Sequence, residues 1–244
     1  MKNKVIISKT PLRVSFVGGG TDMPYFYKKY SGATISCAID RYIYVTVKFH
    51  NNYLEKYRLN YSETENTNSL NKIKNLRIKG VIKMLKINKP LYINTFADIP
   101  ASSGLGSSSS FTVGLIKALS ELNNKKLSKK QIAEMAFKIE SNITHNSIGK
   151  QDHYIASFVG INFIKYDKKE VKIFPINVSK KKLNLFFKRM ILIWTGKNRS
   201  AVDVLNDQKS NIKKNIYYLR EINKYTLEFK KEILKKKFKY KKII

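Results

Sequence analysis

The chain has 244 residues, which is enough for one large domain or two small ones, and its 43% hydrophobic content excludes a disordered chain. No run of residues approaches 18 consecutive apolar side chains, so no membrane-spanning helix is predicted. The first seven residues lack the apolar segment of a signal peptide, and the single cysteine, Cys37, excludes an internal disulfide. We therefore expect a soluble, cytoplasmic protein.

The formal net charge is +31, which would ordinarily indicate a nucleic-acid partner. The excess is almost all lysine, with 41 lysines against 7 arginines, and the lysines are scattered until the last fifteen residues. Proteins that read nucleic acids usually cluster their basic residues and use arginine for bidentate contacts. We therefore predict no nucleic-acid partner and treat the basic tail as a solvated charge run.

The pattern of the first hundred residues predicts mainly strands. Apolar runs at 5–7 and 12–17, separated by Lys9-Thr10-Pro11, predict two strands with a break between them. Alternating apolar residues over 34–49 predict one long or bent strand with a single buried face. The polar residues 50–75 indicate a surface excursion. A helix over 76–85 and a strand over 91–97 are predicted to follow.

Two helices with clear signals come next. Apolar side chains at helical spacing predict the first over 107–122. The second begins at Ser128, which forms a capping box with Gln131. A short helix over 152–158 and strands over 160–166 and 171–176 are expected after it.

The last part of the chain is predicted to form a separate, smaller unit. Lys180-Lys181-Lys182 reads as a linker, residues 190–194 as a strand, and the remainder as lysine-rich helix. Helices and strands alternate irregularly, so the predicted class is α+β. The predicted domains are residues 1–182 and 183–244.

The strongest local feature is the segment 100–110, Pro-Ala-Ser-Ser-Gly-Leu-Gly-Ser-Ser-Ser-Ser, which leads directly into a helix. Glycines let a backbone approach a ligand closely, and a helix start offers free N–H groups to an anion. The segment lacks the Gly-Lys-Ser/Thr of a Walker loop and the third glycine of a dinucleotide fingerprint. We interpret it as a phosphate cradle rather than a flexible linker.

Two carboxylates and a second glycine turn are placed to serve phosphoryl transfer. Glu140 lies at the end of the capped helix, and Asp152 lies in Gly149-Lys150-Gln151-Asp152. Such a reaction needs groups that hold a metal and orient the attacking hydroxyl. The turn Gly18-Gly19-Gly20-Thr21-Asp22 ends in an acid suited to sugar hydroxyls. His153, beside Asp152, could touch substrate, but a hydrogen-bonded structural histidine is favoured.

These segments resemble the GHMP kinases. The resemblance lies in residues 11–22, in the 100–110 loop and in Gly149-Lys150-Gln151-Asp152, in the order of that family. Residues 195–201, Thr-Gly-Lys-Asn-Arg-Ser-Ala, add a similarity to the branch that phosphorylates D-glycero-D-manno-heptose 7-phosphate. The resemblance implies a two-domain kinase fold, with ATP as phosphate donor and Mg²⁺ as its companion.

The resemblance also implies roles for individual residues. Asp152 would be the catalytic aspartate and Arg13 its basic neighbour, while Glu140 and Ser108 would bind Mg²⁺. The nucleotide phosphates would be held by Pro100, Ser103, Gly104, Leu105, Gly106, Ser107 and Ser108. The sugar phosphate would be held by Gly20, Thr21, Asp22, Lys150 and Arg199. A homodimer is left open, and no membrane partner is expected.

The C-terminal part departs from the family pattern. GHMP kinases carry a third glycine-rich motif late in the second domain, whereas no glycine follows Gly196 here. We therefore expect a second domain that is truncated. The predicted activity is transfer of the ATP γ-phosphoryl group to the anomeric hydroxyl of a heptose 7-phosphate. The alternatives are another GHMP sugar 1-kinase, similar to galactokinase or fucokinase, and an inactive remnant that only binds nucleotide.

Overall fold

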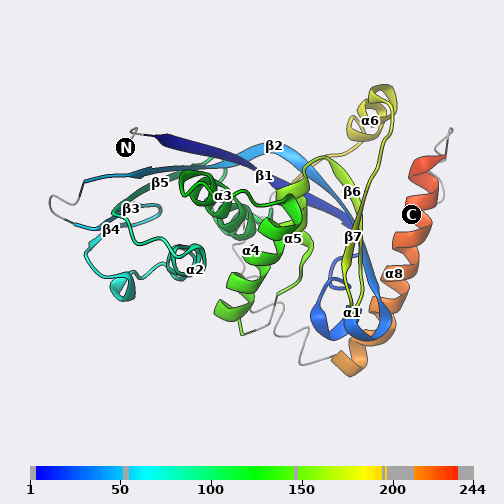
Figure 1. The fold of residues 1–244 in the computed structure, drawn as a ribbon. Helices are drawn as coiled ribbons and strands as arrows, with labels where there is room; N and C mark the ends of the chain where they lie inside the picture. Colours follow the sequence, from blue (N-terminus) through cyan, green and yellow to red (C-terminus); the bar gives the residue numbers. More distant parts are fainter. Residues whose placement is uncertain (1–3, 52–54, 146–147, 194–195, 197–211, 236–244) are drawn as a thin grey trace.

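The computed structural model describes residues 4–51, 55–145, 148–193, 196 and 212–235. Its centre is one sheet with helices on both faces (Figure 1). The strands run in the order β4-β3-β5-β2-β6-β7, and β1 pairs with the other edge of β2. Their bounds are β1 Val5–Val17, β2 Gly32–Phe49, β3 Tyr57–Asn60, β4 Thr64–Thr67, β5 Leu91–Ala97, β6 Ile161–Tyr166 and β7 Val171–Pro175.

The long strand β2 connects the two ends of the sheet. Its residues Ile43–Phe49 pair with β5, its residues Gly32–Cys37 pair with β6, and β1 runs antiparallel along its other side. Within the described residues only β3 and β5 pair in parallel. The predicted long strand is confirmed, but its single buried face holds only near residues 43–47, where Val45 and Val47 are fully buried and Thr46 between them is partly exposed. Residues 32–37 are all buried, because this part of the strand is covered on both faces.

Helices cover the two faces of the sheet unequally. The main core lies between the sheet and the helices α2, α3 and α4, and a smaller cluster lies under α5. Neighbouring strand residues point to opposite faces, so Ile164 packs under α5 whereas Phe163 packs toward α8. The helices are α1 Pro24–Tyr30, α2 Leu76–Leu85, α3 Ser107–Leu122, α4 Lys129–Ile143, α5 Gln151–Phe158, α6 Lys180–Phe187 and α8 Ile212–Leu234, with a 3₁₀ turn at Leu70–Lys72.

The predicted α+β class is confirmed, and the predicted helices over 76–85 and 107–122 and the strand over 91–97 have the observed bounds. The capping box at Ser128 is also present, with both of its hydrogen bonds to Gln131. It fixes the start of α4, the helix that carries Glu140.

Two predictions for the first hundred residues are wrong. The break at Lys9-Thr10-Pro11 does not occur, because β1 absorbs the proline as a shift in register between Pro11 and Arg13. The polar excursion over 50–75 contains the β3–β4 hairpin, which adds to the sheet edge because Tyr57 and Leu59 are buried against it.

The C-terminal predictions are corrected as well. Lys180-Lys181-Lys182 is no linker but the first turn of α6, capped by Ser179, so the predicted boundary at 182/183 falls inside a helix. Residues 190–193 form no strand and are exposed, and Trp194 lies outside the described residues. α6 and α8 pack together through Phe186 and Phe229, which both contact Phe16 of β1.

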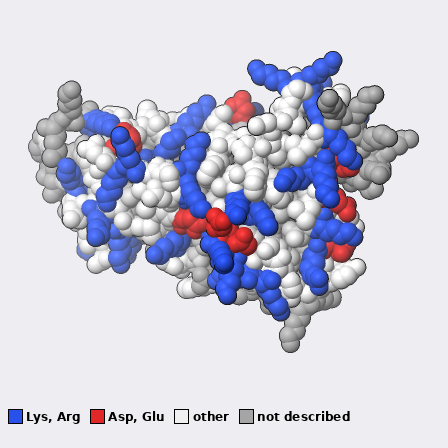
Figure 2. Space-filling model, turned by 45° about the vertical axis from the view of Figure 1, so that its right-hand side comes forward, with Lys and Arg blue, Asp and Glu red and all other residues white. Residues whose placement is uncertain are grey.

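Basic side chains are spread over the surface. Figure 2 shows lysines and arginines across the whole visible face, interrupted by a few small groups of acidic side chains. This distribution agrees with the scattered lysines of the sequence and shows no single basic stripe on that face. Among the described helices, none is long and apolar enough to span a membrane.

Candidate active site

The loop that leads into α3 has the backbone conformation of an anion cradle. Gly104 and Gly106 have φ angles of +75° and +74°, which favour glycine. Gly106 is the N-cap of α3 and has no side chain to cap it, so the first N–H groups of the helix remain available. The Ser103 hydroxyl is buried without a hydrogen-bond partner among the described residues. These features fit the phosphates of a nucleotide.

Arg13 joins this loop to Asp152. Its Nε donates to Asp152 Oδ1 and its Nη2 to Oδ2, both at 2.6 Å, which is a bidentate ion pair. The remaining Nη1 donates to the carbonyl of Gly104 at 2.7 Å, and the Arg13 backbone N–H donates to the carbonyl of Leu105 at 3.0 Å. Burial opposes the charge of Arg13, but Asp152 raises the pKa of the guanidinium above its ordinary value. The predicted catalytic pair is therefore held directly beside the cradle.

Asp22 binds the backbone of the residue that precedes Asp152. Its carboxylate accepts hydrogen bonds from the backbone N–H of Gln151 at 2.9 Å and of Gly20 at 3.2 Å. A Cβ on Gly149 would lie 2.0 Å from Asp22 Oδ2, so only glycine permits this approach. Burial raises the pKa of Asp22, whose side chain is almost completely enclosed. Asp22 thus positions the start of α5, and with it Asp152.

The predicted sugar site around this turn is only partly supported. Thr21 is fully buried, and its hydroxyl donates to the carbonyls of Gly18 and Ala33. The Lys150 amino group binds both carboxylate oxygens of Glu134, at 2.7 and 2.9 Å. The Thr21 hydroxyl is therefore engaged within the fold, whereas the Lys150 ammonium contacts Glu134 and keeps a third N–H donor, and Arg199 lies outside the described residues.

Glu140 lies at the centre of a buried hydrogen-bond network. Its Oε1 accepts from Arg77 Nε, Ser108 Oγ and Thr112 Oγ1, each at 2.7 Å. Its Oε2 lies 3.0 Å from both Ser109 Oγ and His153 Nε2. Burial alone would raise the pKa of Glu140, but His153 and Arg77 outweigh it and hold that pKa far below its ordinary value.

This network changes the role predicted for Glu140. Both of its oxygens already accept hydrogen bonds and the side chain has no exposed surface, so Glu140 does not fit a direct metal ligand in this arrangement. Ser108 fits better, because it is exposed at the start of α3 and gives its hydroxyl proton to Glu140, which turns the oxygen lone pairs outward. Within the described residues, no group of three His, Cys, Asp or Glu side chains could hold a metal.

The sequence interpretation missed Arg77 and favoured a structural role for His153. His153 is fully buried and lies within hydrogen-bond distance of Glu140 and Ser109, as that interpretation expected. Arg77 lies in the first turn of α2, where the helix dipole disfavours a cation. A basic residue at such a position is a signal for an acidic partner elsewhere in the fold.

A glycine loop at a helix start beside a buried Arg–Asp pair is an arrangement suited to phosphoryl transfer. Residues 75–160 match the family model described as "GHMP kinases N terminal domain". This segment of the chain is therefore similar to the GHMP kinases, and the similarity supports a phosphotransferase that acts on small molecules.

Several individual kinases are also similar to the chain. The chain is 29% identical to the D-glycero-alpha-D-manno-heptose 7-phosphate kinase of Campylobacter jejuni, over 96% of this chain and 73% of that protein. A galactokinase of Thermosipho africanus is 29% identical over 62% of this chain and 42% of its own length. Among solved structures, a D-glycero-D-manno-heptose 1-phosphate kinase from Bacteroides thetaiotaomicron has a TM-score of 0.72 and 26% identity, covering 90% of this chain and 74% of that one.

Proposed function

We propose that this protein transfers the γ-phosphoryl group of ATP to the anomeric hydroxyl of D-glycero-D-manno-heptose 7-phosphate. The observation that carries the proposal is the bidentate Arg13–Asp152 pair, tied through Gly104 to the loop before α3. This pair lies where the end of a phosphate chain bound at the helix start would meet an acceptor hydroxyl. The choice of sugar is supported by the similarity to the heptose 7-phosphate kinase of Campylobacter jejuni, and a heptose as acceptor is supported also by the solved heptose 1-phosphate kinase.

The chemistry follows from this placement. The γ-phosphate would bind at the N–H groups of the first turn of α3, and the sugar hydroxyl would donate a hydrogen bond to Asp152. A bond forms between the hydroxyl oxygen and the γ-phosphorus, the bond from that phosphorus to the β–γ bridging oxygen breaks, and ADP leaves. The hydroxyl proton passes to Asp152 or to the medium. Arg13 offsets the negative charge that develops near Asp152.

Mg²⁺ would neutralise part of the phosphate charge when it is bound. Ser108 is the residue that fits it, with Glu140 fixing the orientation of the Ser108 hydroxyl. The residues that position the reaction are Arg13, Asp22 and Asp152, which the hydrogen bonds described above hold in one rigid group.

The test is ATP turnover by the purified chain with D-glycero-D-manno-heptose 7-phosphate, galactose, fucose and mevalonate, each beside Asp152→Asn. We expect turnover with the heptose phosphate and a fall in kcat of about 10²- to 10⁴-fold in the variant. Turnover that the variant leaves unchanged would contradict the role of Asp152. A better rate with galactose or fucose would indicate another sugar 1-kinase, and ATP binding without any turnover would indicate a nucleotide-binding remnant.

A further inference from the structure

A guanidinium from α2 lies at the start of α3. Arg77 Nε and Ser108 Oγ donate to the same oxygen of Glu140, so the guanidinium is a neighbour of the first turn of α3. We propose that Arg77 binds a phosphate oxygen of the nucleotide at this helix start. This inference rests on the proposed function, because it adds a binding residue to the same phosphate site.

Arg77 has donors left for a ligand. Within the part of the chain that the structure describes, Arg77 donates a hydrogen bond through its Nε alone, to Glu140. A guanidinium carries five N–H donors in a planar fork, so four remain on the two Nη atoms. The side chain is 31% exposed, whereas its partner Glu140 is completely buried. Glu140 therefore fixes one edge of the guanidinium and leaves the other edge accessible.

Two other cations of the described residues, both close to Asp152 in the chain or in space, contact acidic or carbonyl partners. Arg13 uses Nε, Nη1 and Nη2 for Asp152 and Gly104, and Lys150 binds Glu134. A nucleotide triphosphate brings several negative charges to the helix start, and arginine is well suited to bind phosphate in a bidentate manner. Arg77 is the arginine of this network with both Nη groups available.

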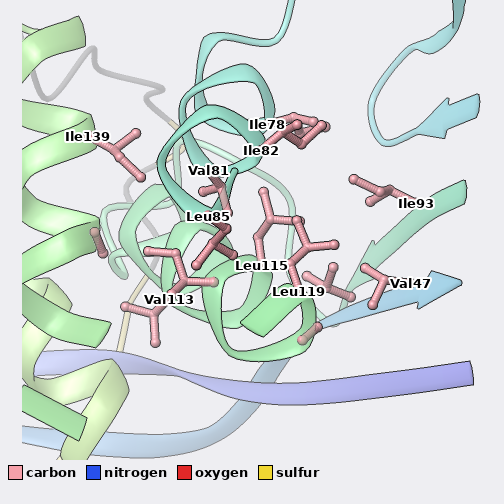
Figure 3. Packing of buried hydrophobic residues seen from close by; sticks show 14 of the residues in the cluster. Val47, Ile78, Val81, Ile82, Leu85, Ile93, Val113, Leu115, Leu119 and Ile139 are labelled. Atoms are coloured by element: carbon pink, nitrogen blue, oxygen red, sulfur yellow. The ribbon is translucent and has the colours of Figure 1, made fainter. Parts of the chain in front are cut away.

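The helix that carries Arg77 is rigidly placed. Ile78, Val81, Ile82 and Leu85 on the inner face of α2 are all almost completely buried. Figure 3 shows these side chains directed toward Leu115 and Leu119 of α3, with Ile139 of α4 approaching from the side. A binding group on such a packed helix needs little ordering when the ligand arrives, which favours affinity.

The test is nucleotide binding by the whole chain, measured by titration calorimetry with ATP, ADP and adenosine. We expect Arg77→Met to weaken ATP binding about 10- to 100-fold, which corresponds to the loss of a charged hydrogen-bonded contact. Adenosine carries no phosphate, so its affinity is expected to stay within about twofold of the wild-type value. Arg77→Lys is expected to recover part of the ATP affinity.

A purely structural role for Arg77 needs its own control, since Arg77→Met leaves the buried Glu140 charge unpaired. The double variant Arg77→Met/Glu140→Gln removes both charges, and its thermal unfolding reports whether the fold is restored. ATP binding that is weaker in a stable double variant than in Glu140→Gln alone supports the proposal. ATP binding at the wild-type level in that variant overturns it and leaves Arg77 as a counter-ion only.

A matched surface variant, Arg58→Met, removes one positive charge from the edge hairpin, where Arg58 pairs with Glu55. It is expected to leave ATP affinity unchanged, and an equal loss in both variants would overturn the proposal in favour of a general charge effect. Failure of the proposed function is distinguishable, because it is measured as absence of turnover with the sugar phosphate, whereas the role of Arg77 is measured as ATP affinity.

Discussion

Gly106 sets how closely the loop before α3 approaches the Arg13–Asp152 pair. Its φ angle is +74°, and an added Cβ would lie 3.2 Å from both Arg13 Cγ and Asp152 Oδ2. Gly104 has nearly the same φ angle, +75°, but an added Cβ there would meet no atom within 4 Å. The two positions therefore separate backbone strain from crowding of the active site.

We predict that Gly104→Ala and Gly106→Ala each lose about 1–2 kcal/mol of unfolding free energy, because both force alanine into a left-handed conformation. Only Gly106→Ala should displace Asp152, by a few tenths of an ångström, and we expect a fall in kcat smaller than the roughly 10²-fold that a displacement of about 1 Å costs. Urea unfolding and steady-state kinetics with saturating ATP measure the two effects. Equal kcat values for the two variants would show that the rate does not depend on the position of Asp152 beside Gly106.

Glu140 makes the stability of the fold depend on pH. Its pKa in the folded protein is lowered, so its contribution is fully present above the unfolded value near 4.5 and is lost as the pH falls toward the folded value. Removing one member of a buried ion pair costs about 3–5 kcal/mol, and the partial exposure of Arg77 favours the lower end.

We therefore predict that Glu140→Gln lowers the unfolding free energy by about 3 kcal/mol at neutral pH. The difference from the wild type should shrink as the pH falls below about 4.5, because the wild-type carboxylate then begins to lose its advantage. Urea unfolding at several pH values provides the measurement. A difference that stayed constant from neutral pH to pH 3 would show that the charge of Glu140 contributes nothing.

Sequence alone could identify the loop and the Arg13 and Asp152 residues, because their motifs lie in short, ordered segments. It could not show that Asp22 binds backbone N–H groups or that Glu140 is enclosed. Those properties depend on a contact between residues over a hundred positions apart for Asp22, and on contacts among four helices for Glu140. The spacing of a motif does not indicate which oxygen of a carboxylate remains accessible in the folded protein.

At the scale of elements, α3 is set against β1 at unusually close range. Ser8 Oγ donates to the carbonyl of Gly114, and Ser110 Oγ donates to the carbonyl of Pro11, both at 2.8 Å. A Cβ on Gly114 would lie only 2.7 Å from Thr10 Oγ1. This contact sets the distance between the strand that carries Arg13 and the helix that carries Ser108.

We predict that Gly114→Ala destabilises the protein, although alanine is the better helix former by about 1 kcal/mol. Overpacking a buried contact costs about 1–3 kcal/mol, which exceeds or cancels that gain. Thr10→Ala removes the obstructing hydroxyl, which is buried without a partner among the described residues. Thermal unfolding of both single variants and the double variant gives the coupling. Additive effects would contradict a direct contact between the two side chains.

The elements that sequence predicted correctly are those whose pattern agrees with their packing. α2, α3 and β5 have apolar side chains at the period of their own structure and were predicted with the observed bounds. The β3–β4 hairpin was missed because only three of its eight strand residues, Tyr57, Leu59 and Glu65, are buried, and they lie in a polar stretch. The start of α6 was missed because the three consecutive lysines after the Ser179 cap were interpreted as a linker.

At the scale of the whole molecule, charge acts against compactness. A formal net charge of +31 produces self-repulsion that unfolding would relieve. The basic side chains are spread over the face shown in Figure 2, so this repulsion is a long-range effect between exposed groups. Salt screens such exposed charges strongly and buried ion pairs weakly. The Arg13–Asp152 pair is mostly buried and should therefore survive conditions that remove the repulsion.

We predict that raising NaCl from about 0.05 M to about 0.5 M raises the melting temperature by roughly 2–4 °C, the shift expected for about 1 kcal/mol in a chain of this size.

If the charge instead served a nucleic-acid site, oligonucleotide binding would be tight and would fall steeply with salt. Binding of a single-stranded oligonucleotide and of ATP over the same salt series separates the two. We expect weak oligonucleotide binding that vanishes near 0.2 M salt, while ATP binding persists because Arg77 and the α3 N-terminus form a local site. Tight oligonucleotide binding at about 0.2 M salt, or a melting temperature that falls with salt, would contradict this account of the charge.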